Sequence, residues 1–297
     1  MAIRTTLPRT LLALSALAAL ALPAPAAAAS AHCSPAGCRS YGPAVPLGNG
    51  AMRTYAELDG DRPLAVGLSL TGGALDGLPT EPNDGHHCFD RDGDGTIDLA
   101  TECSDGHENV LALPPALHRL PGMPLRWALV NWNPMGHGPV GVYDRAHFDV
   151  HFYLQPKAER DAIRPGPCMI LVDCADFATA TEPLAPDYLP QDYTDRHLVE
   201  PAMGNHLVDP TGPEWHGIPF TRTFIYGAYG ARITFLEPMI AVAALDQAAA
   251  GTAPGDCSPV KQPAAWQQPG WYPRQYCVRY RPATEEYTVS LEDFARG

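Results

Sequence analysis

The sequence predicts a mainly β protein, in which antiparallel sheets form a sandwich or a barrel-like fold with one or two short helices and long loops. The 297 residues include 32 prolines and 27 glycines, which interrupt the chain too often for long helices. The apolar stretches between these residues are short and rich in β-branched and aromatic side chains, which is typical of strands.

The first 29 residues have the plan of a cleavable signal peptide. Arg4 and Arg9 form a basic region, an apolar run extends from Leu11 to Leu22, and small residues surround an expected cleavage after Ala29. A retained membrane anchor is the alternative, but the apolar run is shorter than the ~20 residues that span a bilayer. We expect a secreted, periplasmic or cell-surface protein without a transmembrane segment after cleavage.

The charge of the chain argues against nucleic acid as a partner. The formal net charge is −13, and loss of the signal peptide would remove two arginines and no acid. Proteins that bind phosphate backbones carry clustered Lys and Arg, and the chain beyond residue 29 has no such cluster larger than two. An acidic surface instead favours divalent cations.

The eight cysteines all follow the signal peptide, and their even number in an exported chain predicts four disulfides. Their spacing favours pairing of neighbours, although other connectivities stay open. A zinc site is the alternative, but the sequence has no C-x-x-C. The cysteines are Cys33, Cys38, Cys88, Cys103, Cys168, Cys174, Cys257 and Cys277.

The expected domain organisation is simple. Residues 30–47 form a Pro/Gly-rich lead, and residues 48–297 form a single β-rich domain that carries an acidic insertion at 81–108. The chain is long enough for two smaller domains as well, but no internal repeat indicates a division.

Short apolar segments give the expected strands in chain order. Two of the connections have hairpin signals, namely Tyr229-Gly230 and the segment 281–286. The expected strands are Arg53–Leu58, Ala65–Leu70, Arg126–Asn131, His147–Leu154, Met169–Val172, Thr223–Ala228, Arg232–Leu236, Tyr276–Tyr280 and Tyr287–Leu291.

Helix signals are few. A short amphipathic helix is expected at Lys157–Ile163, and a second at Met239–Ala249, which would be entered through Pro238. Residues 250–275 contain five prolines and no periodicity, so we expect a long surface excursion there.

The most specific local motif is the run "DRDGDGTIDLATE" at residues 90–102, which matches most of an EF-hand calcium loop. Gly95 takes the position of the sharp turn, and Thr101 replaces the bidentate glutamate of the full motif. A shifted loop could recruit Glu102, which lies one place later. The expected calcium ligands are Asp90, Asp92, Asp94, the Thr96 carbonyl, Asp98 and Glu102.

The expected role of this calcium ion is structural. The flanks of the loop lack the long helices of a true EF-hand pair, and the insertion at 81–108 holds nine acids and one arginine. Such crowded negative charge repels itself without a counter-ion. A solvated acidic loop that binds no ion is the alternative.

A second group of polar residues lies in the segment 131–154. His147, Asp149 and His151 alternate with apolar residues, so on a strand they share one face and could bind a transition metal such as zinc. His147 and His151 stand ~13 Å apart on a straight strand, which is too far to share an ion. Either Asp149 binds with one of them, or the two histidines serve different partners.

Further metal-ligand candidates are His137, His206 and Glu237. If His147, Asp149, His151 and His206 form a single site, they must converge although 59 positions separate the first from the last. The alternative is that these histidines are hydrogen-bonded structural groups without an ion.

The segments "HFDVHFY" (residues 147–153) and "FIYGAYGARITFLEPM" (residues 224–239) resemble a family of secreted bacterial proteins of unknown function. The resemblance covers roughly residues 48–80 and 109–245, and 81–108 look like an insertion into it. It implies a β-rich fold and self-association as a homo-oligomer, and it implies no established activity. The polar signature of the family falls on His137, His147, Asp149, His151, His206 and Glu237.

Two functions fit the sequence. The first is a secreted, calcium-stabilised binding or structural protein whose His/Asp residues bind a metal or another ligand without turnover. The second is a metal-dependent secreted enzyme, a hydrolase or a lyase, in which Glu237 or Asp149 activates a water molecule. A G-x-S-x-G elbow, a phosphate loop and a dinucleotide fingerprint are absent from the sequence.

Overall fold

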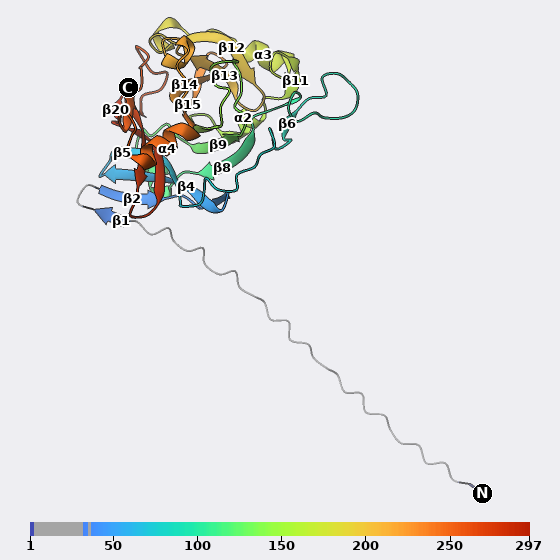
Figure 1. Cartoon of the computed structure of the whole chain (residues 1–297), viewed down its shortest axis with the longest axis horizontal. Helices are drawn as coiled ribbons and strands as arrows, with labels where there is room; N and C mark the ends of the chain where they lie inside the picture. Colours follow the sequence, from blue (N-terminus) through green and yellow to red (C-terminus); the bar gives the residue numbers. More distant parts are fainter. Residues whose placement is uncertain (3–31, 35–36) are drawn as a thin grey trace.

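Two antiparallel sheets make up most of the computed structural model (Figure 1), which describes residues 1–2, 32–34 and 37–297 of the chain. The predicted mainly β fold with short helices is therefore confirmed. The expected signal peptide falls almost entirely outside the described residues. Among those residues, no helix combines the length and the apolar character needed to cross a membrane.

The first sheet joins the two ends of the described chain. Its strand order is β1-β2-β4-β5-β19-β18-β16, with β3 paired to β4. The strands within residues 30–47 add to its edge, so most of the expected lead belongs to this sheet. The strands are β1 (His32–Ser34), β2 (Gly37–Tyr41), β3 (Val45–Leu47), β4 (Gly50–Asp59), β5 (Arg62–Leu70), β16 (Cys257–Pro259), β18 (Gln275–Arg281) and β19 (Glu286–Glu292).

The second sheet has the order β12-β13-β14-β15-β10-β9-β8. The predicted hairpin at residues 229–232 connects β14 and β15, and its central residues Gly230 (φ 57°) and Ala231 (φ 55°) have the left-handed backbone of a tight turn. The strands are β8 (His107–Ala112), β9 (Trp127–Asn133), β10 (His147–Tyr153), β12 (Thr194–Glu200), β13 (Gly204–Val208), β14 (Arg222–Tyr229) and β15 (Arg232–Ala241).

The main core lies between the two sheets. On β10, Phe148, Val150 and Phe152 point into this core, where they join Val66 and Leu68 of β5 in one cluster of buried apolar side chains. Full burial of an aliphatic or aromatic side chain contributes about 1.5–3 kcal/mol. The alternating pattern of β10 therefore fixes which face of the strand meets the first sheet.

The opposite face of the second sheet is also buried along the central strands β9, β10 and β15. A separate apolar cluster covers part of it, including Leu129 of β9, Tyr153 of β10 and Phe235 of β15. Polar residues that alternate onto this face, such as His147 and His151, are consequently withdrawn from solvent. We call this surface the outer face of the second sheet.

Two expected elements differ from the structure. Residues 169–172 form no strand, because Met169 (φ 39°) and Leu171 (φ 59°) adopt left-handed backbone between the linked Cys168 and Cys174. The expected helix at 239–249 begins only at Val242, because residues 238–241 pair with β14 and β10 as the end of β15. Sheet pairing outweighs the local helix signal there.

The remaining elements are short. The first expected helix, at Lys157–Ile163, is present as the shorter α2, which ends at Asp161, and Asp173 caps α3 by accepting hydrogen bonds from two backbone amides. These elements are α1 (Pro115–His118), α2 (Lys157–Asp161), α3 (Cys174–Ala180), α4 (Val242–Ala250), the 3-10 turns η1 (Pro186–Tyr188) and η2 (Pro213–His216), β6 (His87–Cys88), β7 (Cys103–Ser104), β11 (Pro165–Cys168), β17 (Trp271–Tyr272) and β20 (Ala295–Arg296).

Three disulfides confirm the prediction of neighbour pairing. They join Cys88 to Cys103, Cys168 to Cys174, and Cys257 to Cys277. The side chains of the fourth expected pair lie outside the described part of the chain, although the backbones of Cys33 and Cys38 face each other across β1 and β2.

Candidate metal centre

The middle of the outer face carries the polar residues that the sequence singled out. His147, Asp149 and His151 alternate along β10, and the side chain of each is at least 93% buried. Neighbouring strands supply the groups beside them, because Asn133 of β9 lies opposite His147 and Glu237 comes from the adjacent β15. The sheet therefore concentrates His, Asp, Asn and Glu side chains where an apolar surface would be expected.

His151, His206 and Glu237 form one group, which we call the deep triad. His151 Nε2 lies 3.5 Å from Glu237 Oε1, and His206 Nε2 lies 4.0 Å from Glu237 Oε2. One ligand atom from each of the three residues falls within 4.8 Å of the others, as needed to surround one ion. The strands β10, β13 and β15 each contribute one residue.

The charges of the deep triad are strongly affected by burial. Burial lowers the pKa of His151 to about 3, so its imidazole is neutral at physiological pH. Burial, together with the charges of Asp149 and Glu200, raises the pKa of Glu237 well above its ordinary value. Both ring nitrogens of His151 and Oε2 of Glu237 lack a hydrogen-bond partner among the described residues.

His137, His147 and Asp149 form a second group, which we call the rim triad because His137 is only half-buried. Asp149 Oδ1 lies 3.0 Å from His147 Nε2, and Asp149 Oδ2 lies 3.2 Å from His137 Nε2. The amide of Asn133 donates a hydrogen bond of 2.7 Å to the same Oδ2. Their ligand atoms also lie within 4.8 Å of one another.

In the rim triad, the carboxylate of Asp149 and the nearby histidines shift one another's pKa values. Burial alone would raise the pKa of Asp149, but the nearby His147 and His137 hold it well below its ordinary value. Burial would likewise lower the pKa of His137, yet Asp149 raises it to about 9. A cation at this position, whether a proton or a metal ion, is therefore strongly favoured.

Both triads border one cavity of about 480 Å³. His137 and Asp149 of the rim triad and His206 of the deep triad line it, with the carboxylates of Asp105 and Glu200. No lysine or arginine lies in this lining, so positive charge at the wall has to come from histidine or from a bound cation. The arrangement can hold a cation and leave room beside it for a small molecule.

The acidic insertion builds one wall of the cavity. Leu99, Ala100 and the segment 103–106 line it from that side, whereas the tip of the insertion projects away from the body of the molecule (Figure 1). Arg91 donates a hydrogen bond of 2.7 Å to the carbonyl of Met169, which ties the insertion to the segment that carries Ile170, another lining residue.

Three of the six expected calcium ligands lie close together at the tip. Carboxylate oxygens of Asp90, Asp92 and Asp94 fall within 4.8 Å of one another. Glu102 is buried and turned into the loop, where Oε1 accepts from the amides of Arg91 and Asp92. Asp98 accepts instead from the Ala100 amide and the Thr101 hydroxyl, and the Thr96 amide donates to Asp94.

Sequence reasoning missed a buried charged network beside the rim triad. Arg160 of α2 forms an ion pair with Glu108, and Glu108 also lies 3.2 Å from His87. Burial and the charge of Glu200 raise the pKa of Asp105 well above its ordinary value. The available signal was the position of Glu108, which the alternation of β8 places on the outer face. No sequence pattern indicates that Arg160 of α2 is its partner.

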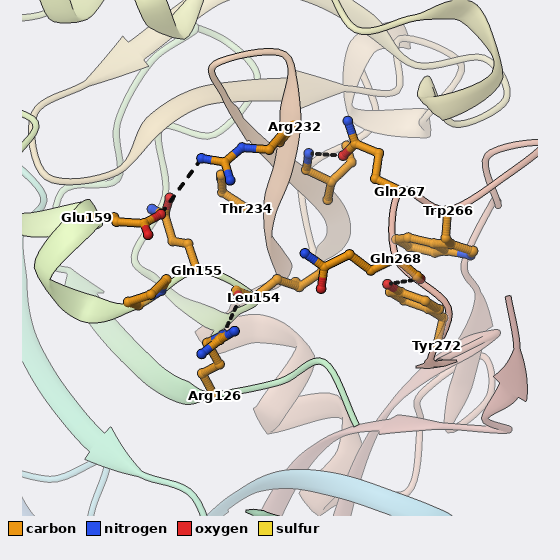
Figure 2. A pocket seen from close by; sticks show the side chains of 12 residues that line it. Arg126, Leu154, Gln155, Glu159, Arg232, Thr234, Trp266, Gln267, Gln268 and Tyr272 are labelled. Carbon is orange, nitrogen blue, oxygen red and sulfur yellow. Dashed lines mark hydrogen bonds and ion pairs between the residues drawn. The ribbon is translucent and has the colours of Figure 1, made fainter. Parts of the chain in front are cut away.

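A smaller pocket of about 140 Å³ lies at the opposite end of β10 (Figure 2). Trp266 and Tyr272 stack there at 3.5 Å between ring centroids, and Arg232 pairs with Glu159 across the pocket at 3.8 Å. Its lining contains neither His nor Cys, and its one carboxylate already faces an arginine. This pocket is therefore no candidate for a metal site.

The structure thus brings all six predicted metal-ligand residues to the outer face, but in two groups. His147 and His151 belong to different triads, in agreement with the distance expected along a straight strand. His206 lies on the same side of the sheet as Asp149, and both line the cavity. No single point lies within reach of all six.

Comparisons with known proteins provide no further assignment, because no family model, no curated protein and no solved structure matches the chain.

Proposed function

We propose that the protein is an extracellular metal-binding protein, in which the deep triad binds a divalent transition-metal ion of the zinc class. The observation that supports this most strongly is His151, a fully buried histidine with no hydrogen-bond partner for either ring nitrogen among the described residues. A buried polar group without a partner costs about 1–3 kcal/mol. A metal ion offsets this cost by accepting the nitrogen lone pair.

The donor set of the deep triad fits zinc. Two imidazoles and one carboxylate are ligands that zinc accepts in tetrahedral sites. His206 donates its Nδ1–H to the Leu198 carbonyl at 3.0 Å, which leaves Nε2 directed at Glu237 with its lone pair free. A second hydrogen bond of this kind is typical of metal-bound histidine, because it fixes the tautomer and the ring orientation.

Calcium binding by the acidic insertion is part of the proposal. The alternating aspartates and the inward-facing Glu102 support a site for a hard cation with oxygen ligands. The disulfides Cys88–Cys103 and Cys168–Cys174 support an oxidising, extracellular location. Self-association stays a prediction of the family resemblance.

A second candidate function is metal-dependent hydrolysis or elimination. The cavity favours it, because a catalytic zinc site keeps three protein ligands and an open position, whereas a structural site is closed. His206 reaches the cavity wall beside Glu200, so water and substrate could meet an ion there. In that function the bound ion would supply Lewis acidity, and the carboxylates of the wall would accept a proton.

Elemental analysis of the purified protein tests the metal site. Protein dialysed against zinc, with calcium present, should retain zinc, and His206→Ala should lose the ion of the deep triad. His118→Ala is the matched control, because His118 is exposed in α1 and belongs to neither triad. Equal zinc contents in both variants and the wild type would refute the deep triad as the site.

A further inference from the structure

We propose that the rim triad is a second metal site, so that the outer face holds two divalent ions side by side at one cavity. This inference rests on the proposed metal-binding function and deepens it. It is supported by the direction of the hydrogen bonds around His137, His147 and Asp149, independently of the unpartnered histidine of the deep triad.

Both histidines of the rim triad use Nδ1 as a donor. His137 Nδ1 lies 2.8 Å from the carbonyl of Gly138, and His147 Nδ1 lies 2.5 Å from the carbonyl of Arg145. A carbonyl oxygen only accepts, so each Nδ1 carries the proton of the neutral ring. Each Nε2 then presents a lone pair, and both point at the carboxylate of Asp149.

Two lone pairs facing a carboxylate at 3.0 and 3.2 Å are satisfied by a positive charge between them. The Asn133 amide, 3.5 Å from His147 Nε2, is at the limit of hydrogen-bond distance. If a proton on each Nε2 supplied the charge, both rings would become imidazolium ions. Their centroids are only 4.7 Å apart, and they would share a single carboxylate. One divalent ion instead satisfies His137, His147 and Asp149 together, without placing two cationic rings in contact.

The surroundings of Asp149 support an ion beside its Oδ1, on the side that faces His147. Asn133 donates to Oδ2, whereas Oδ1 has no hydrogen-bond partner among the described residues although His147 Nε2 is only 3.0 Å away. A neutral amide that holds one carboxylate oxygen and leaves the other free is a common outer partner of a metal ligand. The Nδ1 contacts to main-chain carbonyls complete the same pattern.

The two sites would be close neighbours. Asp149 and His151 are alternate residues of β10, ~7 Å apart between Cα atoms, and the two sites open on the same cavity. The cavity wall also carries Asp105 and Glu200 and no basic side chain, so two divalent ions would balance its negative charge. Paired divalent ions bind the oxygen atoms of carboxylates and phosphate esters, which defines the expected ligand class.

Metal stoichiometry tests the inference. The protein is dialysed against zinc with saturating calcium and analysed by mass spectrometry of the elements. We expect two zinc ions per chain in the wild type, one in His137→Ala, one in His206→Ala and none in the double variant. Circular dichroism and thermal melting should show that His137→Ala is folded, because this histidine is only half-buried.

The outcomes separate the two proposals. One zinc per wild-type chain that His206→Ala removes and His137→Ala retains would overturn the second site and leave the deep triad intact. Two zinc ions in both the wild type and His137→Ala would place the second ion elsewhere and also overturn the inference. Zinc-free wild-type protein would overturn the proposed function itself. Cobalt(II) offers an independent readout, because two equivalents should develop visible absorption in the wild type and one in His137→Ala.

Discussion

The two faces of strand β10, in the second sheet, are equally buried and chemically opposite. On β10 the inner residues Phe148, Val150 and Phe152 join the main core, whereas the alternate residues His147 and His151 lie on the outer face with no exposed surface. The inner face is covered by another sheet, and the outer face by loops and short helices. Burial alone therefore does not distinguish a folding core from a functional site.

The energetic difference between the faces follows from their chemistry. Each apolar side chain of the inner face stabilises the fold on burial. Each unpartnered polar atom of the outer face reduces stability, because it gives up water without a replacement. Burial of the inner face thus offsets the loss of folding free energy at the outer face. A cation bound at the outer face should reduce that loss, because it gives the unpartnered polar atoms a partner.

The largest expected effect comes from matched substitutions on the two faces of β10. Phe152→Ala should lower the free energy of unfolding by about 3–5 kcal/mol, because it leaves a cavity in the main core. His151→Leu, measured with a transition-metal chelator and added calcium, should change it by less than about 1 kcal/mol, because it removes unpartnered polar atoms. Urea denaturation measures both. A loss above ~2 kcal/mol for His151→Leu would show that His151 is a structural group and would remove the contrast.

The second effect concerns Glu108 on the outer face of β8. Burial alone would raise its pKa, but hydrogen bonding from His87 and the charge of Arg160 lower it to about 2, from an ordinary 4.5. Because the folded pKa is the lower one, the carboxylate stabilises the fold above pH ~4.5, and this contribution is lost as the pH falls toward 2.

Glu108→Gln should therefore be less stable than the wild type by up to about 3 kcal/mol near pH 6. The difference should shrink as the pH falls to 2.5, which urea denaturation at several pH values would measure. A difference that stays constant over this range would mean that the Glu108 charge contributes nothing.

The third effect is stabilisation by zinc. An ion bound only by the folded state adds about 2.7 kcal/mol at a hundred times its Kd. The wild type should show a rise in melting temperature with zinc, and the variant with both His137→Ala and His206→Ala should show none. Phe152→Ala should keep the full zinc-dependent rise despite its lower starting stability. Loss of that rise in Phe152→Ala would mean that zinc binding at the outer face depends on the packing of the inner face.

The smallest expected effect is stabilisation by calcium bound to the acidic insertion, which forms one wall of the cavity at the outer face. Calcium at ten times its Kd should stabilise the wild type by about 1.4 kcal/mol. The variant with Asp92→Ala and Asp94→Ala should lose this gain in calorimetric melts. Asp59→Ala with Asp61→Ala, at the exposed turn between β4 and β5, is the matched control and should keep the gain.

Much of the fold could be predicted because it depends on local patterns. The alternation along residues 147–153 predicted a strand with one polar face, and Tyr229-Gly230 predicted a hairpin that the structure contains. Residues 239–241 show the limit of such patterns, because their pairing partners on β10 and β14 are distant in sequence and outweigh the helix signal.

The candidate site was predictable in composition and not in arrangement. The sequence indicated the six candidate ligand residues, but the division into two triads depends on strand order, which places Glu237 beside His151 and Asn133 beside His147. The ion pair of Arg160 with Glu108 needs α2 to pack against the outer face, and no local pattern encodes that contact.

The pairing of β5 with β19 has a consequence for the order in which the chain can fold. The hydroxyl of Ser69 donates to Glu286 across 217 positions of sequence, at the centre of the first sheet. A ribosome must therefore complete nearly the whole described chain before this sheet can close. Contacts between such distant residues make folding slow, and this sheet can close only after every strand of the second sheet has been made.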